Sequence, residues 1–257
     1  MSLKHQQKRH KNCFQNKKSS LVEEFRKIVR CIRTHKYAFI APRNFKILIT
    51  KYGFKADCQH DCQELLTCLL NNFHDELKGK LTNETLCKMC TKMSVSSQDF
   101  YILNLPIPLS GTCSLQDCFT TFFKIERIDK WTCSSCKAPR EAEIAMQLTK
   151  MPPILIIALN RFEYGDRFCR KKDNLVTYPV KLFLHSEKEK KQYQLYGTIN
   201  HAGSLNQGHY TASSYDAGAG KWINFDDKVI HEMPSLDIVG HFHCAKPLPE
   251  CLVTGWK

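Results

Sequence analysis

The sequence lacks the features that mark membrane, secreted and low-complexity chains. No stretch approaches the roughly 18 uncharged apolar residues that a membrane-spanning helix needs. The N-terminus carries no apolar run, so no secretory signal is expected. Hydrophobic residues make up 42% and charged residues 25% of the 257 residues, which excludes a collagen-like or fully disordered chain. The length suits one large domain or two small ones.

Acidic residues are scarce relative to basic ones. The chain has 25 Asp and Glu against 38 Lys and Arg, which gives a formal net charge of +13. Residues 1–36 contain 11 basic and only two acidic side chains, so most of the excess lies at the N-terminal end. Residues 1–19 are polar and without periodicity, and we interpret them as a basic disordered arm. A solvated tail is the simpler interpretation, and nuclear import or nucleic-acid contact is the alternative.

Cysteine, by contrast, is abundant, with 14 residues. Without a secretory signal, these thiols are expected in a reducing compartment, where they bind metal or react rather than form disulfides. The sequence therefore indicates a cytoplasmic or nuclear location.

Helices are expected first along the chain and strands later. Residues 20–34 predict a helix that starts at a capping box of Ser20 and Glu23. Its apolar face would consist of Leu21, Phe25, Ile28, Val29 and Ile32. Two more helices are expected at residues 59–77 and 115–125, and strands at residues 100–105, 154–162, 193–199, 209–215 and 221–225. This order favours an α+β fold over a repeating βαβ arrangement.

Two C-x-x-C pairs, Cys87/Cys90 and Cys133/Cys136, are separated by 42 residues. Two such pairs can place four thiolates around a tetrahedral Zn²⁺, and a closed four-cysteine site of this kind is structural. The alternatives are two unrelated pairs or a redox pair. A redox pair would belong to a thioredoxin-like strand-to-helix turn, which the sequence does not predict.

A histidine and a carboxylate are expected to meet near the C-terminal end. His209 opens one predicted strand and Asp226 ends the next, so a hairpin joining the strands would bring the two together. A carboxylate fixes the tautomer and orientation of a histidine that acts as a general base. The alternative interpretation is an ordinary hydrogen bond on the surface of a sheet.

The chain resembles the catalytic domain of the ubiquitin-specific protease (USP) family over residues 20–232. The resemblance rests on several motifs in order. They are Gln59-His60-Asp61-Cys62-Gln63-Glu64-Leu65, the C-x-x-C pairs flanking Leu103-Asn104-Leu105-Pro106-Ile107, the segment from Pro152 to Phe162, Tyr193 with Leu195 and Tyr196, His201, Gly203, Gly208-His209-Tyr210, and Trp222 with Phe225-Asp226-Asp227.

The resemblance implies a papain-like fold with a thumb (20–80), zinc-ribbon fingers (81–150) and a palm (151–232), followed by a divergent tail at 241–257. It implies that His209 is the general base, that Asp226 orients it, and that Asp227 assists neighbouring polar contacts. It places Asp61 and Tyr210 along the channel that receives the basic, Gly-rich C-terminal tail of ubiquitin.

The resemblance is incomplete at both ends of the domain. In the family, the nucleophile belongs to a Cys box well before the helix that starts at residue 59. The most similar position here is Cys13, which has basic flanks and has Lys8 where an oxyanion-binding Asn is expected. After Glu232 the family has a palm strand, and residues 240–247 show no such pattern. We therefore expect that strand to be missing.

Three functions follow from these expectations. The first is a deubiquitinase that hydrolyses the isopeptide bond after the last glycine of ubiquitin. The second is a non-catalytic scaffold that binds ubiquitin or ubiquitinated proteins, which the absence of a recognisable nucleophile favours for this polypeptide. The third is a zinc-ribbon nucleic-acid binder, which ranks last because the basic residues cluster in the arm and not around the cysteine pairs.

Overall fold

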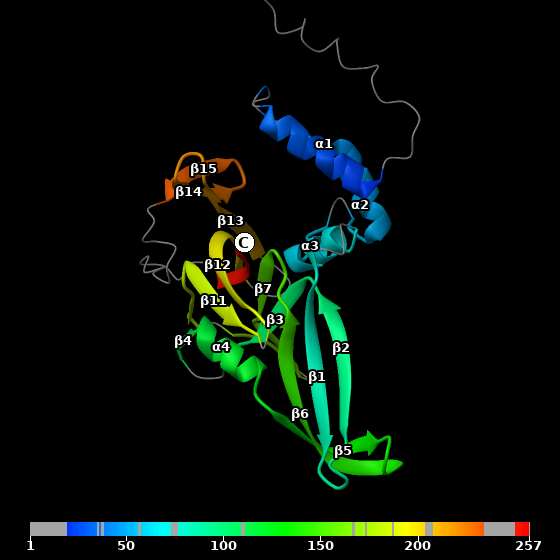
Figure 1. Ribbon diagram of the computed structural model, residues 1–257. Helices are drawn as coiled ribbons and strands as arrows, with labels where there is room; N and C mark the ends of the chain where they lie inside the picture. The colour runs from blue at the N-terminus through cyan, green and yellow to red at the C-terminus, as the bar shows by residue number, and fades with distance from the viewer. Residues whose placement is uncertain are drawn as a thin grey trace, which may run out of the picture. The chain divides into compact units, whose positions relative to one another are not determined.

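A computed structural model describes residues 20–34, 36, 39–55, 58–72, 77–108, 111–165, 168–172, 174–186, 188–203, 208–233 and 250–256. The described residues fall into two compact units, which divide the chain between Phe73 and His74 (Figure 1). Mixed helix and sheet confirm the expected α+β class. Among the described helices, none has the length and apolar character needed to cross a membrane.

The first unit is helical. Its elements are α1 (Leu21–Arg33), α2 (Arg43–Ile49), the 3₁₀ turn η2 (Thr50–Tyr52) and α3 (Cys62–Asn71). Helix α1 starts where the sequence predicts, because the Ser20 side chain accepts a hydrogen bond from the backbone N–H of Glu23 at 3.2 Å. The short helix α2 was not predicted from the sequence.

Burial along α1 differs from the predicted apolar face. Leu21 is buried as expected, but Ile32 at the other end of the stripe is 58% exposed. Glu24 is buried instead, with 5% of its surface exposed, and its carboxylate pairs with Lys27. A carboxylate can be buried at this position because its charge is matched by a cation one helical turn further on.

Helix α3 is shorter than the predicted helix over residues 59–77. It starts at Cys62, because Asp61 adopts an extended conformation and its Oδ1 accepts hydrogen bonds from the backbone N–H groups of Gln63 and Glu64 at 2.7 and 3.0 Å. It ends at Asn71, and Asn72 is the C-cap residue.

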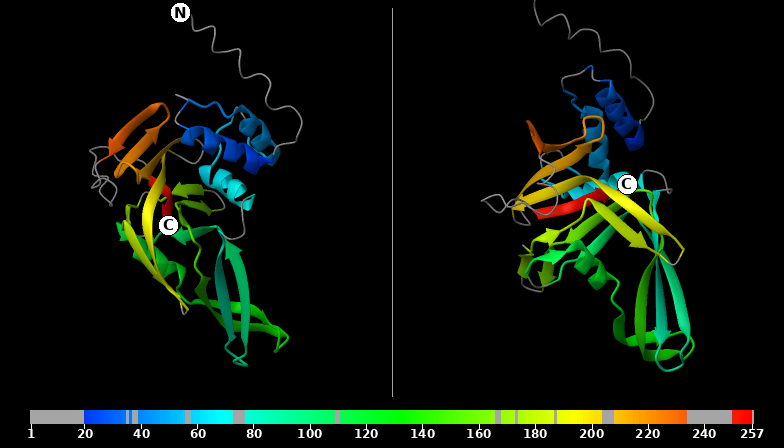
Figure 2. Two further views of the ribbon diagram at one scale, coloured as in Figure 1. Left: turned by 45° about the horizontal axis from the view of Figure 1, so that its top comes forward. Right: turned by 60° about the vertical axis from the view of Figure 1, so that its left-hand side comes forward.

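The second unit contains a long four-stranded antiparallel sheet of order β2-β1-β6-β5. Figure 2 shows it as a narrow ribbon that extends from the rest of this unit. Its strands are β1 (Gly79–Cys87), β2 (Met93–Phe100), β5 (Glu126–Cys133) and β6 (Ala138–Lys150). These strands were not predicted one by one, although the region was expected to form the fingers.

The larger sheet has eight strands. Its order is β15-β14-β13-β12-β16-β7-β3, with β11 paired to β12. The strands are β3 (Ile102–Pro106), β7 (Leu155–Asn160), β11 (Lys181–His185), β12 (Lys190–Gly203), β13 (Gly208–Asp216), β14 (Lys221–Asp226), β15 (Val229–Met233) and β16 (Glu250–Trp256). Strand β7 is buried along most of its length, which fits the continuous apolar run in its sequence.

The expectation that no palm strand follows Glu232 is wrong. Strand β16 lies between β12 and β7 and pairs antiparallel with both. The strand was expected at residues 240–247, whereas the ladder uses residues 250–256. The centre of the sheet is therefore complete.

Helix α4 (Leu115–Phe122) packs against β3 and starts with a complete capping box of Ser114 and Asp117. Cys113 and Cys118 stand at the N′ and N4 positions of this helix, and both are buried. This is the geometry of a hydrophobic staple, in which two apolar residues fix the direction of the chain at a helix start. Two short pairs complete the unit: β4 (Cys113–Ser114) with β10 (Val176–Thr177), and β8 (Phe162–Gly165) with β9 (Phe168–Lys171).

Candidate active site and metal centre

The predicted hairpin of β13 and β14 is present and brings His209 to Asp226. In the ladder, Ala212 pairs with Phe225, so the next position places Asp226 opposite Thr211. His209 lies two residues from Thr211 on the same strand and therefore on the same face. His209 and Asp226 are diagonal neighbours, a separation that a histidine side chain can span.

The two side chains form a short, charge-assisted hydrogen bond. His209 Nε2 lies 2.5 Å from Asp226 Oδ1, and about half of each side chain is exposed. This hydrogen bond is the largest cause of a raised pKa of His209; desolvation opposes it, and the charges of Asp226 and Asp227 add smaller effects in the raising direction. In the neutral ring Nε2 carries the proton that Asp226 accepts, so Nδ1 is the basic nitrogen.

Asp227 lies in the turn that joins β14 to β15. Its φ of +50° places it in the left-handed region, which aspartate tolerates better than most residues. One ligand atom from each of His209, Asp226 and Asp227 lies within 4.8 Å of the others. Asp227 therefore contributes negative charge beside the imidazole and makes no direct hydrogen bond to it among the contacts described.

The residues expected to contact substrate have structural contacts of their own. Asp61 is the N-cap of α3, so one of its carboxylate oxygens is engaged with that helix. Tyr210 follows His209 on β13 and pairs across the ladder with His201 on β12. The rings of Tyr210 and His201 are 4.7 Å apart between centroids.

The four cysteines of the two C-x-x-C pairs form a compact cluster. Cys87 ends β1 and Cys133 ends β5, and the turn after each strand brings in Cys90 and Cys136, so that all four Sγ atoms lie within 4.8 Å of one another. The Sγ atoms of Cys90 and Cys133 are 3.7 Å apart. A tetrahedral ion with 2.3 Å bonds to sulfur places its ligands about 3.8 Å apart, so this cluster fits a metal ion.

The protein prepares one of these thiols for ionisation. Backbone N–H groups in the turn from Cys133 to Cys136 donate to the Cys133 thiol, and the Cys136 nitrogen lies 3.4 Å from its Sγ. These hydrogen bonds lower the pKa of Cys133 to about 6. The pKa of Cys136 is raised to about 12, first by its hydrogen bond with Cys90, because neighbouring sulfurs that share protons cannot all ionise together. A cation at the centre favours the thiolate form of all four.

The other cysteines have different environments. Burial raises the pKa of Cys113 and raises that of Cys118 to about 12, so both are inert thiols of the core. Cys13, the candidate nucleophile, lies outside the described residues.

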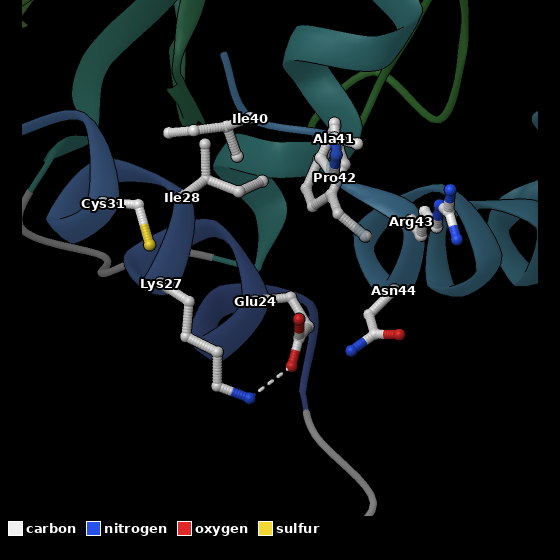
Figure 3. A pocket seen from close by; sticks show the side chains of 10 residues that line it. Glu24, Lys27, Ile28, Cys31, Ile40, Ala41, Pro42, Arg43 and Asn44 are labelled. Atoms are coloured by element: carbon white, nitrogen blue, oxygen red, sulfur yellow. Dashed lines mark hydrogen bonds and ion pairs between the residues drawn. The ribbon is translucent and has the colours of Figure 1, made fainter. Parts of the chain in front are cut away.

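The first unit contains a pocket of about 200 Å³ between α1 and the start of α2 (Figure 3). Its walls combine aliphatic side chains such as Ile28 and Ile40 with the Glu24–Lys27 ion pair and the thiol of Cys31. The ion pair with Lys27 neutralises the buried carboxylate of Glu24. None of the described lining residues indicates which ligand the pocket would bind.

The polar residues around the dyad were not predicted from the sequence. Asn200, Ser213 and Asn224 lie on neighbouring strands, and Asn200 and Ser213 are buried. Asn224 Nδ2 donates to Ser213 Oγ at 3.1 Å. The signal was a set of polar residues at alternate positions, such as Thr198 and Asn200 on β12 and Thr211 and Ser213 on β13, and this pattern predicts a polar face but not its burial.

Comparison with known proteins places this geometry in a family. A family model for ubiquitin carboxyl-terminal hydrolases matches residues 2–241. Ubiquitin carboxyl-terminal hydrolase 4 of Eremothecium gossypii is 28% identical over 262 residues, which cover 73% of this chain and 30% of that protein. Ubiquitin carboxyl-terminal hydrolase 2 of Homo sapiens is 26% identical over 278 residues, which cover 87% of this chain and 46% of that protein.

Solved structures show the same fold. A chain of the SAGA DUB module Ubp8/Sgf11/Sus1/Sgf73 bound to ubiquitin aldehyde superposes with a TM-score of 0.70 at 20% identity, covering 84% of this chain and 53% of that one. The present chain spans only 20% to 34% of the length of the first four curated relatives. It belongs to the ubiquitin carboxyl-terminal hydrolase family and has the fold of a ubiquitin-specific protease.

Proposed function

We propose that the chain is a deubiquitinase that hydrolyses the bond after the last glycine of ubiquitin by thiol chemistry. The observation that carries this proposal is the 2.5 Å hydrogen bond from His209 Nε2 to Asp226. It leaves Nδ1 as the base and holds the ring in one tautomer, which is the arrangement that activates a thiol nucleophile.

The reaction assigns a definite role to each nitrogen of His209. Nδ1 takes the proton of a cysteine thiol, and the thiolate adds to the carbonyl carbon of the terminal glycine. The protonated ring then gives that proton to the departing lysine amine, and water hydrolyses the thioester. Asp226 stabilises the imidazolium throughout and keeps its negative charge.

A ubiquitin probe with a thiol-reactive group at its C-terminus tests the proposal. We expect covalent labelling of the chain, reduced by a factor of about 100 or more in His209→Ala. Cys13→Ala and Cys58→Ala identify the nucleophile, since labelling that disappears in the first and persists in the second assigns Cys13. Absence of labelling in the unmodified chain contradicts hydrolysis.

A second function is a non-catalytic scaffold that binds ubiquitin. The observation in its favour is that, within the described residues, the side chains that shift the pKa of His209 are two carboxylates and include no thiol. Binding of ubiquitin without labelling by the probe would support this function, and His209→Ala would then leave the affinity unchanged.

We also propose that the cysteine cluster holds one structural zinc ion and that the protein works in the cytoplasm or nucleus. Four thiolates and no oxygen or nitrogen donor favour zinc over hard cations. A reducing compartment keeps such a cluster from oxidising to disulfides. Asp61 and Tyr210 remain the proposed contacts to the ubiquitin tail.

A further inference from the structure

Strand β6 carries an arginine between the two halves of the cysteine cluster. The neighbours of β6 in the four-stranded sheet are β1 and β5. Cys87 of β1 pairs with Ala142 of β6, and Cys133 of β5 pairs with Ala138 of β6. Arg140 stands midway between these two alanines. Because directly opposed residues and alternate residues of a strand share a face, Arg140 lies on the face that carries both cysteines.

The guanidinium of Arg140 has a donor that is buried and unpaired. Its Nε has no hydrogen-bond partner among the described residues. Its Nη1 lies 3.5 Å from the carbonyl oxygen of Pro139, at the limit of a hydrogen bond. Buried donors are almost always paired, because an unpaired one costs free energy. A thiolate is a much stronger acceptor than a thiol, so conversion of the neighbouring cysteines to thiolates would provide the acceptor that this side chain lacks.

The side chain of Arg140 also interacts with the second cysteine pair. The hydrogen bond with Cys90 is the largest cause of the raised pKa of Cys136, and a hydrogen bond with the side chain of Arg140 opposes it. A cation that donates to a sulfur stabilises the thiolate, which is the form that binds a metal ion. Arg140 therefore acts on Cys136 in the same direction as a bound metal ion would.

The charge of a four-thiolate site creates a need for such a cation. Four thiolates around a divalent ion leave two excess negative charges, and burying excess charge costs free energy unless it is compensated. Lys88, in the turn of the first pair, is engaged by Glu143 at 2.9 Å, and Glu143 also pairs with Arg127 at 3.3 Å. Within the described residues, Arg140 forms no ion pair with a carboxylate, so its charge can act on the sulfurs.

We propose that Arg140 is a positioning residue of the metal centre, whose guanidinium donates to the thiolate of Cys136 and offsets the negative charge of the four sulfurs. A guanidinium suits this role because it is always charged and presents several donors in one plane. Groups outside the ligand set that hold the ligands in this way strengthen metal binding. This role rests on the proposed structural zinc site and does not depend on whether the chain hydrolyses ubiquitin.

The test is a competition between the full chain and a chromophoric chelator for zinc. In Arg140→Met, which removes the charge and the donors, we expect the zinc affinity to fall about tenfold or more. In Arg140→Lys, which keeps the charge, we expect a smaller loss. Arg127→Met is the control, because it removes the same charge from a side chain on β5 that is 84% exposed, and it should leave the affinity unchanged.

A cobalt(II) spectrum separates the proposed hydrogen bond from a general effect on folding. A sulfur that loses a hydrogen bond gives up its electrons more readily, so the sulfur-to-cobalt charge-transfer band should move to longer wavelength in Arg140→Met. The band should not move in Arg127→Met. An Arg140→Met chain that folds, binds zinc as tightly as the unmodified chain and shows no shift of this band overturns the proposal.

Where Arg140→Met fails to fold, the unmodified chain loaded with a spin-active isotope of cadmium decides. An N–H···S–Cd hydrogen bond transmits a scalar coupling, so NMR should show coupling between cadmium and a guanidinium N–H of Arg140. The backbone N–H of Cys136, which donates to Cys133 Sγ at 3.4 Å, is the internal control. Coupling at Cys136 without coupling at Arg140 overturns the proposal. An unmodified chain that binds no metal would contradict the zinc site itself, and this inference with it.

Discussion

Thr91 and Lys137 occupy equivalent positions in the two halves of the cysteine cluster. Each follows the second cysteine of its pair, and their φ angles are 56° and 55°. In each turn the backbone N–H of this residue donates to the carbonyl of the first cysteine, Thr91 to Cys87 at 3.0 Å and Lys137 to Cys133 at 2.8 Å. The two turns are built alike, and each holds a residue other than glycine in the left-handed region.

Replacing these residues by glycine should stabilise the cluster. A β-branched threonine is especially unfavourable in this region, and glycine has no such penalty. We expect Thr91→Gly to raise the free energy of unfolding by about 1 kcal/mol, with a smaller gain for Lys137→Gly. Thermal unfolding of the metal-loaded chain measures this. Ser135→Gly, at a position without positive φ, is the control, and a gain there of equal size would contradict the explanation.

Asp226→Asn should lower the pKa of His209 toward its ordinary value, because the hydrogen bond to a carboxylate is the main cause of the increase. Since the folded pKa is raised, the pair contributes stability below the unfolded pKa of about 6.5, and that contribution is lost as the pH rises through the folded value. Denaturant unfolding should therefore show a larger effect of Asp226→Asn at pH 5.5 than at pH 8.5. Asp129→Asn, a change on β5, should show no such difference, and equal effects at both pH values for Asp226→Asn would refute the linkage.

Two substitutions at Asp61 separate its role as a helix cap from its charge. Asparagine caps helices as well as aspartate does, so Asp61→Asn should keep the stability of the chain within about 0.5 kcal/mol, whereas Asp61→Ala should lower it by about 1 kcal/mol. If the carboxylate also attracts the basic ubiquitin tail, Asp61→Asn should weaken ubiquitin binding at low salt, as measured by calorimetry. Unchanged binding in a stable Asp61→Asn chain would leave Asp61 as a cap only.

Removal of the metal should loosen the four-stranded sheet and leave the larger sheet folded. We expect one zinc per chain by metal analysis, and rapid amide exchange in β1 and β5 after chelation, because these strands end at the cysteine turns. Cys87→Ser should reproduce this result, while Cys58→Ser, an exposed cysteine outside the cluster, should not. A chain that contains no zinc when purified without chelator would contradict the assignment.

Sequence patterns predicted the parts of the site that depend on local spacing. The hairpin that joins His209 to Asp226 follows from two neighbouring strands and a short turn. The cysteine cluster follows from two C-x-x-C pairs, since each pair forms its own turn. The dyad lies within a single hairpin, and each half of the cysteine cluster is a C-x-x-C turn, so both features follow from local sequence.

The parts that the sequence did not predict depend on distant contacts or lack a hydrophobic pattern. Strand β2 is exposed along nearly its whole length, so no alternation of polar and apolar residues marks it. Strand β16 is fixed by pairing with β7 and β12, roughly 50 or more residues earlier in the chain, and local propensity carries little of that information. Asn200 could be assigned to a polar face but not to a buried one.

The position of β16 has a consequence for biosynthesis. Strands β7 and β12 have no ladder between them other than the one that β16 provides to each. During synthesis, the edges of β7 and β12 therefore stay unpaired until residues 250–256 have left the ribosome. Unpaired strand edges can pair with other nascent chains. Loss of this segment would leave β7 and β12 with unpaired edges at the centre of the larger sheet.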